Sequence, residues 1–319
     1  MSVFSRASSR TRRRHAGADP ADGRPGRPSA ARRVLALAVI VATAAVSGCA
    51  APTTTWSAPA ARPSAPPAAP DPTPATTPAP PEPDEIAPAG FVALSDVDPT
   101  IVQDIRYQTD HNFVGRPIAG YREPLCLLTR AAAERLHRVQ LAARSHGYTL
   151  KVYDCYRPQR AVDDFVRWGQ RPDDQRMKAE FYPNLDKPAL FAQGFIAGPT
   201  AHSRGSTVDL TLVATPPRVQ RPYAPDEALA SCVAPGPERF PDNTVEMGTG
   251  FDCFDPLAHT MNPRVTGAAR QHRLLLTQLM AGAGFRNYAE EWWHYSLMTE
   301  PYPDTYFDFP VARAALAHP

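Results

Sequence analysis

The chain has 319 residues, of which 43% are hydrophobic and 21% are charged, and this composition excludes a chain that is disordered throughout. Its formal net charge of +2 is unevenly distributed, because residues 1–33 hold nine arginines against two aspartates and the remainder is mildly acidic. An acidic folded part argues against nucleic acid as a partner, since nucleic-acid-binding domains present a basic surface.

Residues 1–49 have the pattern of an export signal. Arg32 and Arg33 precede a largely apolar run, residues 34–46, which is too short to span a bilayer. Small residues follow and end at Cys49, an order that resembles the lipobox of bacterial lipoproteins. We therefore expect a lipoprotein anchored through Cys49 to the outer face of the cytoplasmic membrane. A secretory signal with a chance cysteine is the alternative, and in either case the protein is exported.

Residues 50–90 are expected to form a linker. Residues 50–88 contain 13 prolines, interleaved with alanine and threonine. Such a segment forms no packed core, and proline-rich chain favours extended polyproline II. We expect a semi-rigid tether to one folded domain over residues 91–319, and a spacer without a tuned length is the alternative.

The expected domain mixes helical and strand patterns. Apolar residues at helical spacing predict helices over residues 127–145, 160–168 and 268–280. Thr129 is the expected N-cap of the first of these. Strands are predicted over 150–153 and 207–213, where apolar and polar residues alternate. This mixture, with hairpin-like spacing, favours the α+β class.

Four cysteines lie in the expected domain: Cys126, Cys155, Cys232 and Cys253. In an exported protein an even number of cysteines indicates disulfides, and three pairings are open. We favour the pairs that are near in sequence, the first cysteine with the second and the third with the fourth. Buried free thiols are the alternative, and the absence of any Cys-x-x-Cys pair disfavours a zinc site made of cysteines.

Two segments carry residues suited to metal chemistry. His202 lies on a glycine-containing turn, and Asp209 follows seven residues later on a strand whose alternate positions are apolar. A carboxylate on a buried strand needs a strong partner, which a shared metal would supply. His294 follows Glu291 among bulky aromatic residues, and two histidines with one carboxylate make a three-ligand zinc site open to water. A hydrogen-bonded core histidine and a turn network are the alternatives.

Taken together, the motifs of the domain resemble the D-alanyl-D-alanine dipeptidases, zinc peptidases related to the vancomycin-resistance dipeptidase. The matching segments are DIRYQT at 104–109, NFVG at 112–115, YRP at 156–158, HSRGSTVDLTL at 202–212, EWWHY at 291–295, EPYP at 300–303 and YFDFP at 306–310. They occur in the same order and span nearly the whole domain. The resemblance implies the α+β zinc-peptidase fold shared with D,D-carboxypeptidases and the hedgehog signalling domain, an antiparallel sheet with flanking helices.

The resemblance also implies the roles of individual residues. One zinc per chain would be held by His202, Asp209 and His294. Glu291 would be the general base, chosen over its neighbour because the family pattern is Glu-Trp-Trp-His. Arg157 would hold the developing oxyanion, and a surface turn residue is the alternative reading of this arginine.

Three further residues match positions near the substrate pocket of the family: Tyr107, Thr200 and Asp252. An acid at Asp252 would pair with the ammonium group of a free dipeptide. Thr200 stands where relatives usually have serine, so the hydroxyl is on a threonine. The glycine expected before Tyr156 is Cys155, and residues 213–244 form a longer, proline-rich insertion.

The expected location shapes the expected function. Outside the membrane most D-Ala-D-Ala is the end of a stem peptide whose amine is blocked, and a pocket with an acid for the ammonium would reject it. We therefore expect hydrolysis of the free dipeptide in cell-wall peptide turnover or scavenging. A D,D-carboxypeptidase that trims stem peptides and a non-catalytic wall-peptide-binding lipoprotein are the alternatives. The expected partners are a small dipeptide and, through the lipid anchor, a membrane; the oligomeric state stays open.

Overall fold

The computed structural model describes residues 85–196 and 198–317. The expected export signal with Cys49, and residues 50–84 of the expected linker, lie outside the described residues. Within the described ranges, no helix combines the length and the apolar character that crossing a membrane requires.

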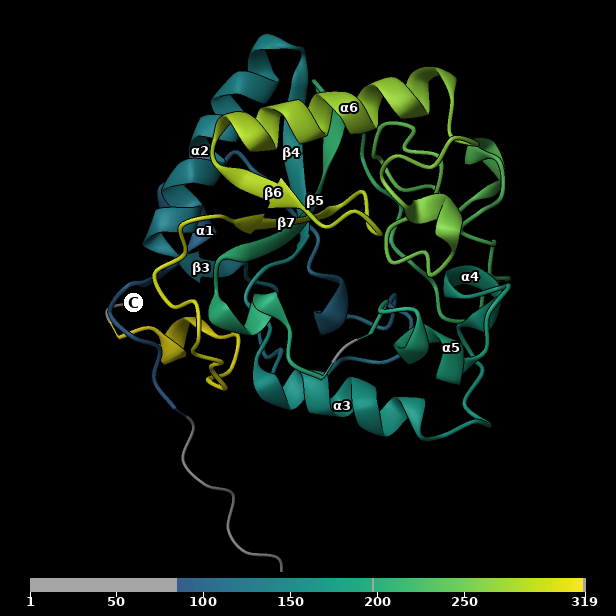
Figure 1. The fold of residues 1–319 in the computed structure, drawn as a ribbon, viewed down its shortest axis with the longest axis horizontal. Coiled ribbons are helices and arrows are strands. Elements are labelled where there is room, and N and C mark those ends of the chain that lie inside the picture. Colours follow the sequence, from purple (N-terminus) through teal and green to yellow (C-terminus); the bar gives the residue numbers. More distant parts are fainter. Residues whose placement is uncertain (1–84, 197, 318–319) are drawn as a thin grey trace, which may run out of the picture. The chain divides into compact units, whose positions relative to one another are not determined.

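A mixed sheet lies at the centre of the described part of the chain (Figure 1). Its strands, in spatial order, are β2 (Val102–Gln103), β4 (Tyr148–Asp154), β5 (Thr207–Ala214), β7 (His294–Leu297) and β6 (Phe285–Asn287). β4 pairs antiparallel with β5, β5 with β7, and β7 with β6, whereas β2 runs parallel to its neighbour β4. A smaller antiparallel pair joins β1 (Phe91–Ala93) to β3 (Leu127–Thr129). The expected antiparallel sheet is thus confirmed, with β2 as its parallel edge.

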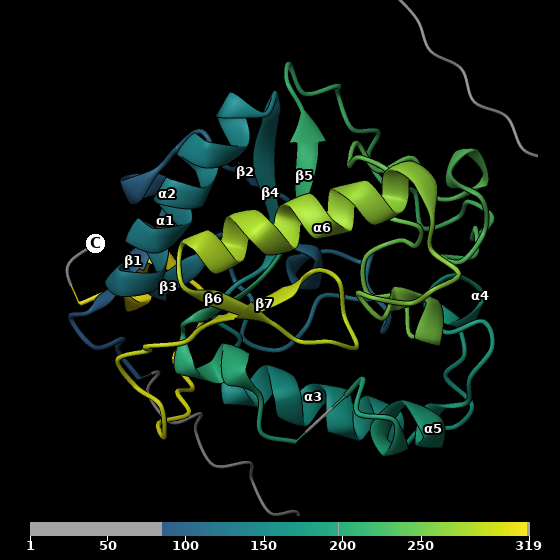
Figure 2. The ribbon, with the colours of Figure 1, turned by 45° about the horizontal axis from the view of Figure 1, so that its top comes forward.

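Helices cover both sides of this sheet. They are α1 (Leu94–Val97), α2 (Arg130–Ser145), α3 (Gln159–Gly169), α4 (Lys178–Phe181), α5 (Lys187–Ala192) and α6 (Gly267–Gly282). Short 3-10 turns occupy Arg106–Gln108, Ala201–Arg204, Gly236–Glu238, Pro256–Ala258 and Arg313–Ala315. Figures 1 and 2 show α2 and α6 on one side of the sheet and α3 on the other. The α+β class and the flanking helices are therefore confirmed.

The predicted helix over residues 127–145 is correct only from Arg130 onward. Residues 127–129 form β3 instead, because their backbone pairs with β1, Leu128 opposite Val92. Thr129 is the N-cap as predicted, since its hydroxyl oxygen accepts a hydrogen bond from the backbone of Ala132 at 3.3 Å. The other predicted strands and helices lie inside β4, α3, β5 and α6.

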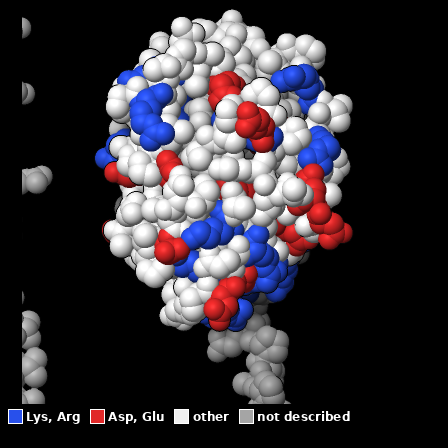
Figure 3. All heavy atoms as spheres, turned by 90° about the vertical axis from the view of Figure 1, so that its right-hand side faces the viewer, with Lys and Arg blue, Asp and Glu red and all other residues white. Residues whose placement is uncertain are grey.

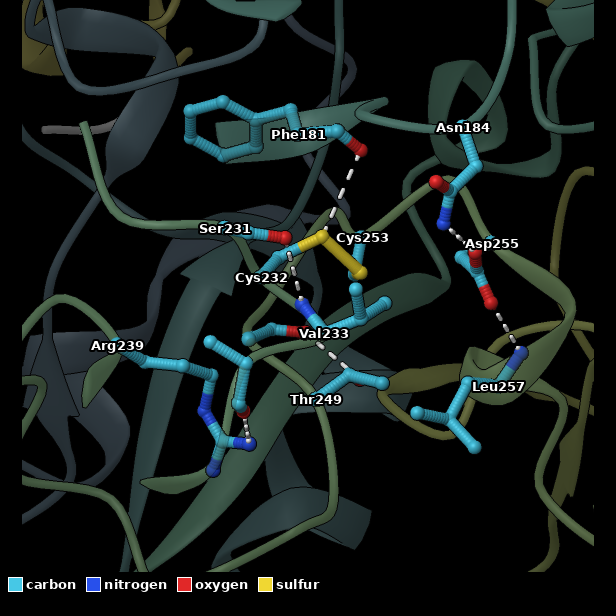
Figure 4. The surroundings of a disulfide bond; sticks show 12 residues. Phe181, Asn184, Ser231, Cys232, Val233, Arg239, Thr249, Cys253, Asp255 and Leu257 are labelled. Carbon is cyan, nitrogen blue, oxygen red and sulfur yellow. Dashed lines mark hydrogen bonds between the residues drawn. A yellow bond between two sulfur atoms is a disulfide. The ribbon is translucent and has the colours of Figure 1, made fainter. Parts of the chain in front are cut away.

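Both favoured disulfides are present: Cys126–Cys155 and Cys232–Cys253. The first joins the residue that precedes β3 to the residue that follows β4. The second joins the long segment after β5 to the segment that precedes α6 (Figure 4). Each bond closes a loop of the chain, which restricts the unfolded state and stabilises the fold.

A cluster of charged side chains is buried against β4. Arg106 donates to Asp104 at 2.9 Å and to Asp242 at 2.7 Å, and the ammonium group of Lys151 also contacts Asp242. Lys151 is fully buried and Arg106 is 4% exposed. Two cations and two carboxylates thus compensate one another, which buried charges require. The cluster fixes the segment around Asp242 to the sheet.

Replacing Asp242 by asparagine should lower the melting temperature at neutral pH, because breaking a buried ion pair costs about 3 kcal/mol. Burial raises the pKa of Asp242, but the charges of Lys151 and Arg106 lower it below its ordinary value. The ionised carboxylate therefore stabilises the fold above about pH 4, and its contribution is lost as the pH falls further. Thermal unfolding of both proteins across pH should show a difference that shrinks below about pH 4. A difference that stays constant in acid would contradict this role.

The face at the right of Figure 1 is shown as spheres in Figure 3. Basic and acidic side chains are interspersed on it. This face therefore presents no extended patch of one charge that would attract a uniformly charged polymer.

Candidate active site

Three side chains from separate elements bring one potential ligand atom each to the same place. His202 lies in the turn Ala201–Arg204, Asp209 on β5 and His294 at the start of β7, where it pairs directly with Asp209. The distances between His202 Nε2, His294 Nδ1 and Asp209 Oδ1 are 3.3 Å for each of the three pairs. The sheet register therefore places residues that are distant in sequence around one point.

This cluster fits a tetrahedral metal ion. Bonds of about 2.0–2.1 Å at tetrahedral angles put neighbouring ligand atoms about 3.3–3.4 Å apart. Among the described residues, no hydrogen bond of good geometry reaches the buried Asp209 Oδ1, and the two imidazole nitrogens 3.3 Å away are the atoms that would share a cation with it. A buried carboxylate oxygen without a partner is costly, and a cation would compensate it. Two nitrogens and one oxygen with a fourth position open are the donor set of catalytic zinc.

The orientation of His202 is fixed from behind. Its Nδ1 donates to the carbonyl oxygen of Cys155 at 2.7 Å, which leaves Nε2 as the atom available to a metal. Cys155 is itself held by the disulfide to Cys126. The hydroxyl oxygen of Thr200 accepts a weak hydrogen bond from the backbone of His202 at 3.4 Å. Cys155, which stands where the family has glycine, thus helps to hold the predicted ligand His202 in place.

The charges of the cluster act on one another. Burial raises the pKa of Asp209, but the neighbouring His202 and His294 lower it far below its ordinary value. Burial lowers the pKa of His294, but its contacts with Asp209 and Glu291 raise it to about 9. Without a metal these carboxylates therefore retain a proton on His294. A metal ion has to displace that proton, so its binding should weaken in acid.

The EWWH segment places its first and last residues at the cluster and its two tryptophans in the core. Glu291 is buried and places Oε2 3.3 Å from His294 Nδ1. The two tryptophans between them point into the core, and Trp292 Nε1 donates to Thr249 Oγ1 at 2.8 Å. Of the two adjacent acids, Glu291 lines the cavity, and Glu290 is half-buried outside the lining. The structure therefore places the predicted base beside the predicted metal ligands.

Arg157 is held in the wall of the cavity by a carboxylate that sequence reasoning missed. Its Nε donates to Asp154 Oδ2 at 2.9 Å, and its head group lies 3.6 Å from Asp209 Oδ2. Asp154 is fully buried and also accepts from the Tyr121 hydroxyl at 2.6 Å. A signal was present, since Asp154 ends the alternating pattern of β4 three residues before Arg157.

The wall of the cavity also carries the acid Asp252. Asp252 is buried and accepts a hydrogen bond from the Tyr107 hydroxyl at 2.8 Å. Burial raises the pKa of Asp252 well above its ordinary value, and the negative charge of Asp209 raises it further. A cation bound beside this carboxyl would offset both effects.

These groups surround a cavity of about 270 Å³. Its lining includes Tyr107, Arg157, Thr200, Asp209, Asp252, Glu291 and His294, with His202 behind Asp209. Aromatic side chains that the sequence did not predict complete the walls: Phe113, Phe165, Phe195, Phe254 and Tyr288. The structure thus brings together every residue predicted for metal, catalysis and substrate. The volume lies near the lower end of ligand pockets, roughly 300–1,000 Å³, and suits a small molecule.

The chain is similar to known proteins over most of its described part. A family model described as "D-ala-D-ala dipeptidase" matches residues 87–216 and 240–312. The D-alanyl-D-alanine dipeptidase of Streptomyces coelicolor is 40% identical over 225 residues, covering 70% of this chain and 98% of the relative. The enzyme of the same name from Enterococcus faecalis is 37% identical over 223 residues, which again cover 70% of this chain and 98% of the relative. That of Escherichia coli is 30% identical over 207 residues, which cover 65% of this chain and 84% of the relative.

The family model leaves residues 217–239 unmatched. The insertion is therefore shorter at both ends than the segment 213–244 that the sequence predicted. Residues 213–214 belong to β5, and Asp242 belongs to the buried charge cluster of the matched part.

Proposed function

The chain belongs to the D-Ala-D-Ala dipeptidase family of peptidases, and we propose that it hydrolyses free D-Ala-D-Ala with one zinc ion held by His202, Asp209 and His294. The observation that supports this most is the convergence on one cavity of three ligand atoms at 3.3 Å, the Glu291 carboxylate and the Arg157 guanidinium. When bound, such an ion supplies Lewis-acid chemistry, acidifying water and polarising a carbonyl oxygen.

Glu291 is the general base in this proposal. Its carboxylate lies beside His294 Nδ1 and therefore next to the place where the attacking water must stand. It takes a proton from that water and then delivers it to the nitrogen of the departing D-alanine. The buried tryptophans that follow it in sequence hold the carboxylate in this position.

Arg157 acts on the carbonyl oxygen of the scissile bond. Its guanidinium is fixed by Asp154 and lies beside the ligand cluster, within 3.6 Å of Asp209. A cation placed before the reaction stabilises the negative charge that develops on this oxygen without reorganising during the step.

Asp252 and Tyr107 form the amine side of the cavity. A free dipeptide carries an ammonium group, which would pair with Asp252 and shift this carboxyl to its ionised form. A stem peptide has an uncharged amide nitrogen at the equivalent place and therefore gains no ion pair with this carboxyl. The proposed site therefore selects the free dipeptide over the blocked one.

Asp252→Asn should raise the KM for D-Ala-D-Ala roughly 10- to 100-fold, because a hydrogen bond to a charged group contributes about 1.5–3 kcal/mol. The value of kcat should change much less, because the ammonium–carboxylate pair is present both in the bound substrate and in the transition state. Steady-state kinetics would measure both constants, and Asp226→Asn, a change at an exposed aspartate, is the control. An unchanged KM would remove Asp252 from the substrate site.

We further propose that the reaction takes place outside the cytoplasmic membrane. The support is the order of residues 32–49, a basic pair, an apolar run and a terminal Cys49, together with two disulfides in the domain. An exported dipeptidase meets dipeptides released from the cell wall, so the proposed role is wall-peptide turnover or scavenging through a lipid-anchored enzyme.

A comparison of three substrates tests the proposal: free D-Ala-D-Ala, its N-acetylated form and a pentapeptide stem. Release of D-alanine from the free dipeptide alone is the expected result. Equal release from the blocked substrates would identify a D,D-carboxypeptidase, and no release from any of the three by the zinc-loaded enzyme would leave only a binding protein.

A further inference from the structure

The insertion of residues 217–239 is joined covalently to the amine side of the cavity. Cys232 of the insertion forms its disulfide with Cys253, the residue that follows Asp252 (Figure 4). Its carbonyl oxygen also accepts from the backbone of Gly250 at 2.9 Å, and its backbone donates to the carbonyl oxygen of Glu180 in α4 at 2.9 Å. A segment that the family model does not match is thus attached on both sides of the residue proposed to bind the ammonium group.

Asp252 needs such support because of its backbone conformation. Its φ is 54°, in the left-handed region that non-glycine residues rarely adopt; aspartate tolerates it better than most, and contacts with the surroundings offset its cost. Residues 247–254, the Asp252 loop, are also anchored from the other side. Phe251 stacks on Tyr153 at 4.3 Å between ring centroids, and Thr249 accepts the hydrogen bond from Trp292. The disulfide and the tryptophan therefore hold the loop between them.

The second disulfide supports the opposite half of the site. Cys155 carries the carbonyl oxygen that accepts from His202 Nδ1, so the bond to Cys126 lies behind a metal ligand. The bond between Cys232 and Cys253 involves no neighbour in sequence of a proposed metal ligand and ends at the residue that follows Asp252. The two bonds should therefore affect different steps, the first metal binding and turnover, and the second recognition of the amine.

We propose that the Cys232–Cys253 disulfide and the insertion that carries it are a positioning device for Asp252, which sets the selectivity of the enzyme for substrates with a free amine. This inference rests on the proposed dipeptidase function. Pairing of a carboxylate with an ammonium group depends on placement within hydrogen-bond distance, and loss of preorganisation lowers affinity. Once released from the disulfide, the loop has to order Asp252 again each time that a substrate binds.

The test compares the full chain with a double variant, Cys232→Ala with Cys253→Ala. The KM for D-Ala-D-Ala should rise roughly tenfold, a loss of about 1.4 kcal/mol. The inhibition constant of N-acetyl-D-Ala-D-Ala, which has no ammonium group, should stay the same, so the ratio of KM to this inhibition constant rises tenfold. Ser231→Ala, a neighbouring change that keeps the disulfide, should alter neither constant. The pair Cys126→Ala with Cys155→Ala should lower kcat and the bound zinc instead.

A ratio that stays constant, with both constants moving together, would overturn the inference and leave the bond a purely stabilising one. Amide hydrogen exchange without substrate gives an independent decision. Exchange in residues 247–254 should become faster in the double variant, whereas exchange in α2 stays unchanged. This readout decides the inference even if the intact enzyme cleaves no dipeptide, a result that would overturn the proposed function alone.

A milder variant covers the case in which the double variant does not fold. Thr249→Val removes the bond from Trp292 and loosens the Asp252 loop from its other side. It should change the same ratio in the same direction by a smaller factor and speed exchange in the same residues. If neither the ratio nor the exchange responds, the loop is not held in the way that we propose.

Discussion

Replacing Glu291 by glutamine should lower kcat for D-Ala-D-Ala about 10³-fold, within the range of roughly 10²–10⁴ that a general base contributes. Glutamine has nearly the same shape but accepts no proton at neutral pH. The three proposed metal ligands do not include Glu291, so the zinc content should remain at one per chain. Turnover measured together with metal analysis separates the loss of a base from the loss of the metal.

Glu290→Gln is the matched control for this experiment, because it removes the adjacent acid, which does not line the cavity. Its kcat should equal that of the unchanged enzyme. If Glu291→Gln retained most of its activity, or if the control lost activity instead, the assignment of the base would be wrong.

Replacing His294 by alanine should abolish both zinc binding and turnover. The change removes one of the three proposed ligands and leaves Asp209 and His202, and two ligands are too few for a tightly held zinc. Bound metal stabilises the folded state by about 2.7 kcal/mol at a free concentration of 100 times its Kd. The variant should therefore also lose the increase in melting temperature that zinc gives the unchanged enzyme.

The control for this second experiment is His146→Ala, at an exposed histidine that caps the end of α2. It should bind zinc and turn over substrate normally. Zinc binding by His294→Ala at the original stoichiometry would show that residues other than the proposed three hold the metal.

The sequence was most informative where chemistry is concentrated in short motifs. The segments around His202 and Asp209 and around Glu291 and His294 each carry two functional groups, and the pairing of β5 with β7 is what brings them together. The spacing within a motif was visible in the sequence. The register that makes the three 3.3 Å distances was implied only by the family resemblance.

Other parts of the site depend on long-range contacts that leave little local signal. Asp154 reads as the end of a strand, and only the fold shows that it holds Arg157 and lies behind His202. The aromatic walls come from elements far apart in the sequence, such as Phe165 on α3 and Tyr288 before β7. Leu128 fits the helical pattern of the residues that follow it, but its pairing with Val92 places it in a strand. In each case tertiary packing, rather than local preference, determined the outcome.

The central claim, a zinc-dependent dipeptidase site built from His202, Asp209 and His294, is tested most directly by a metal titration. Chelator-treated enzyme is supplied with increasing zinc, and release of D-alanine from free D-Ala-D-Ala is measured at each step. The account predicts no release without metal and activity that rises linearly to a plateau at one zinc per chain. Full activity in the metal-free enzyme, or no activity at any amount of zinc, would contradict it.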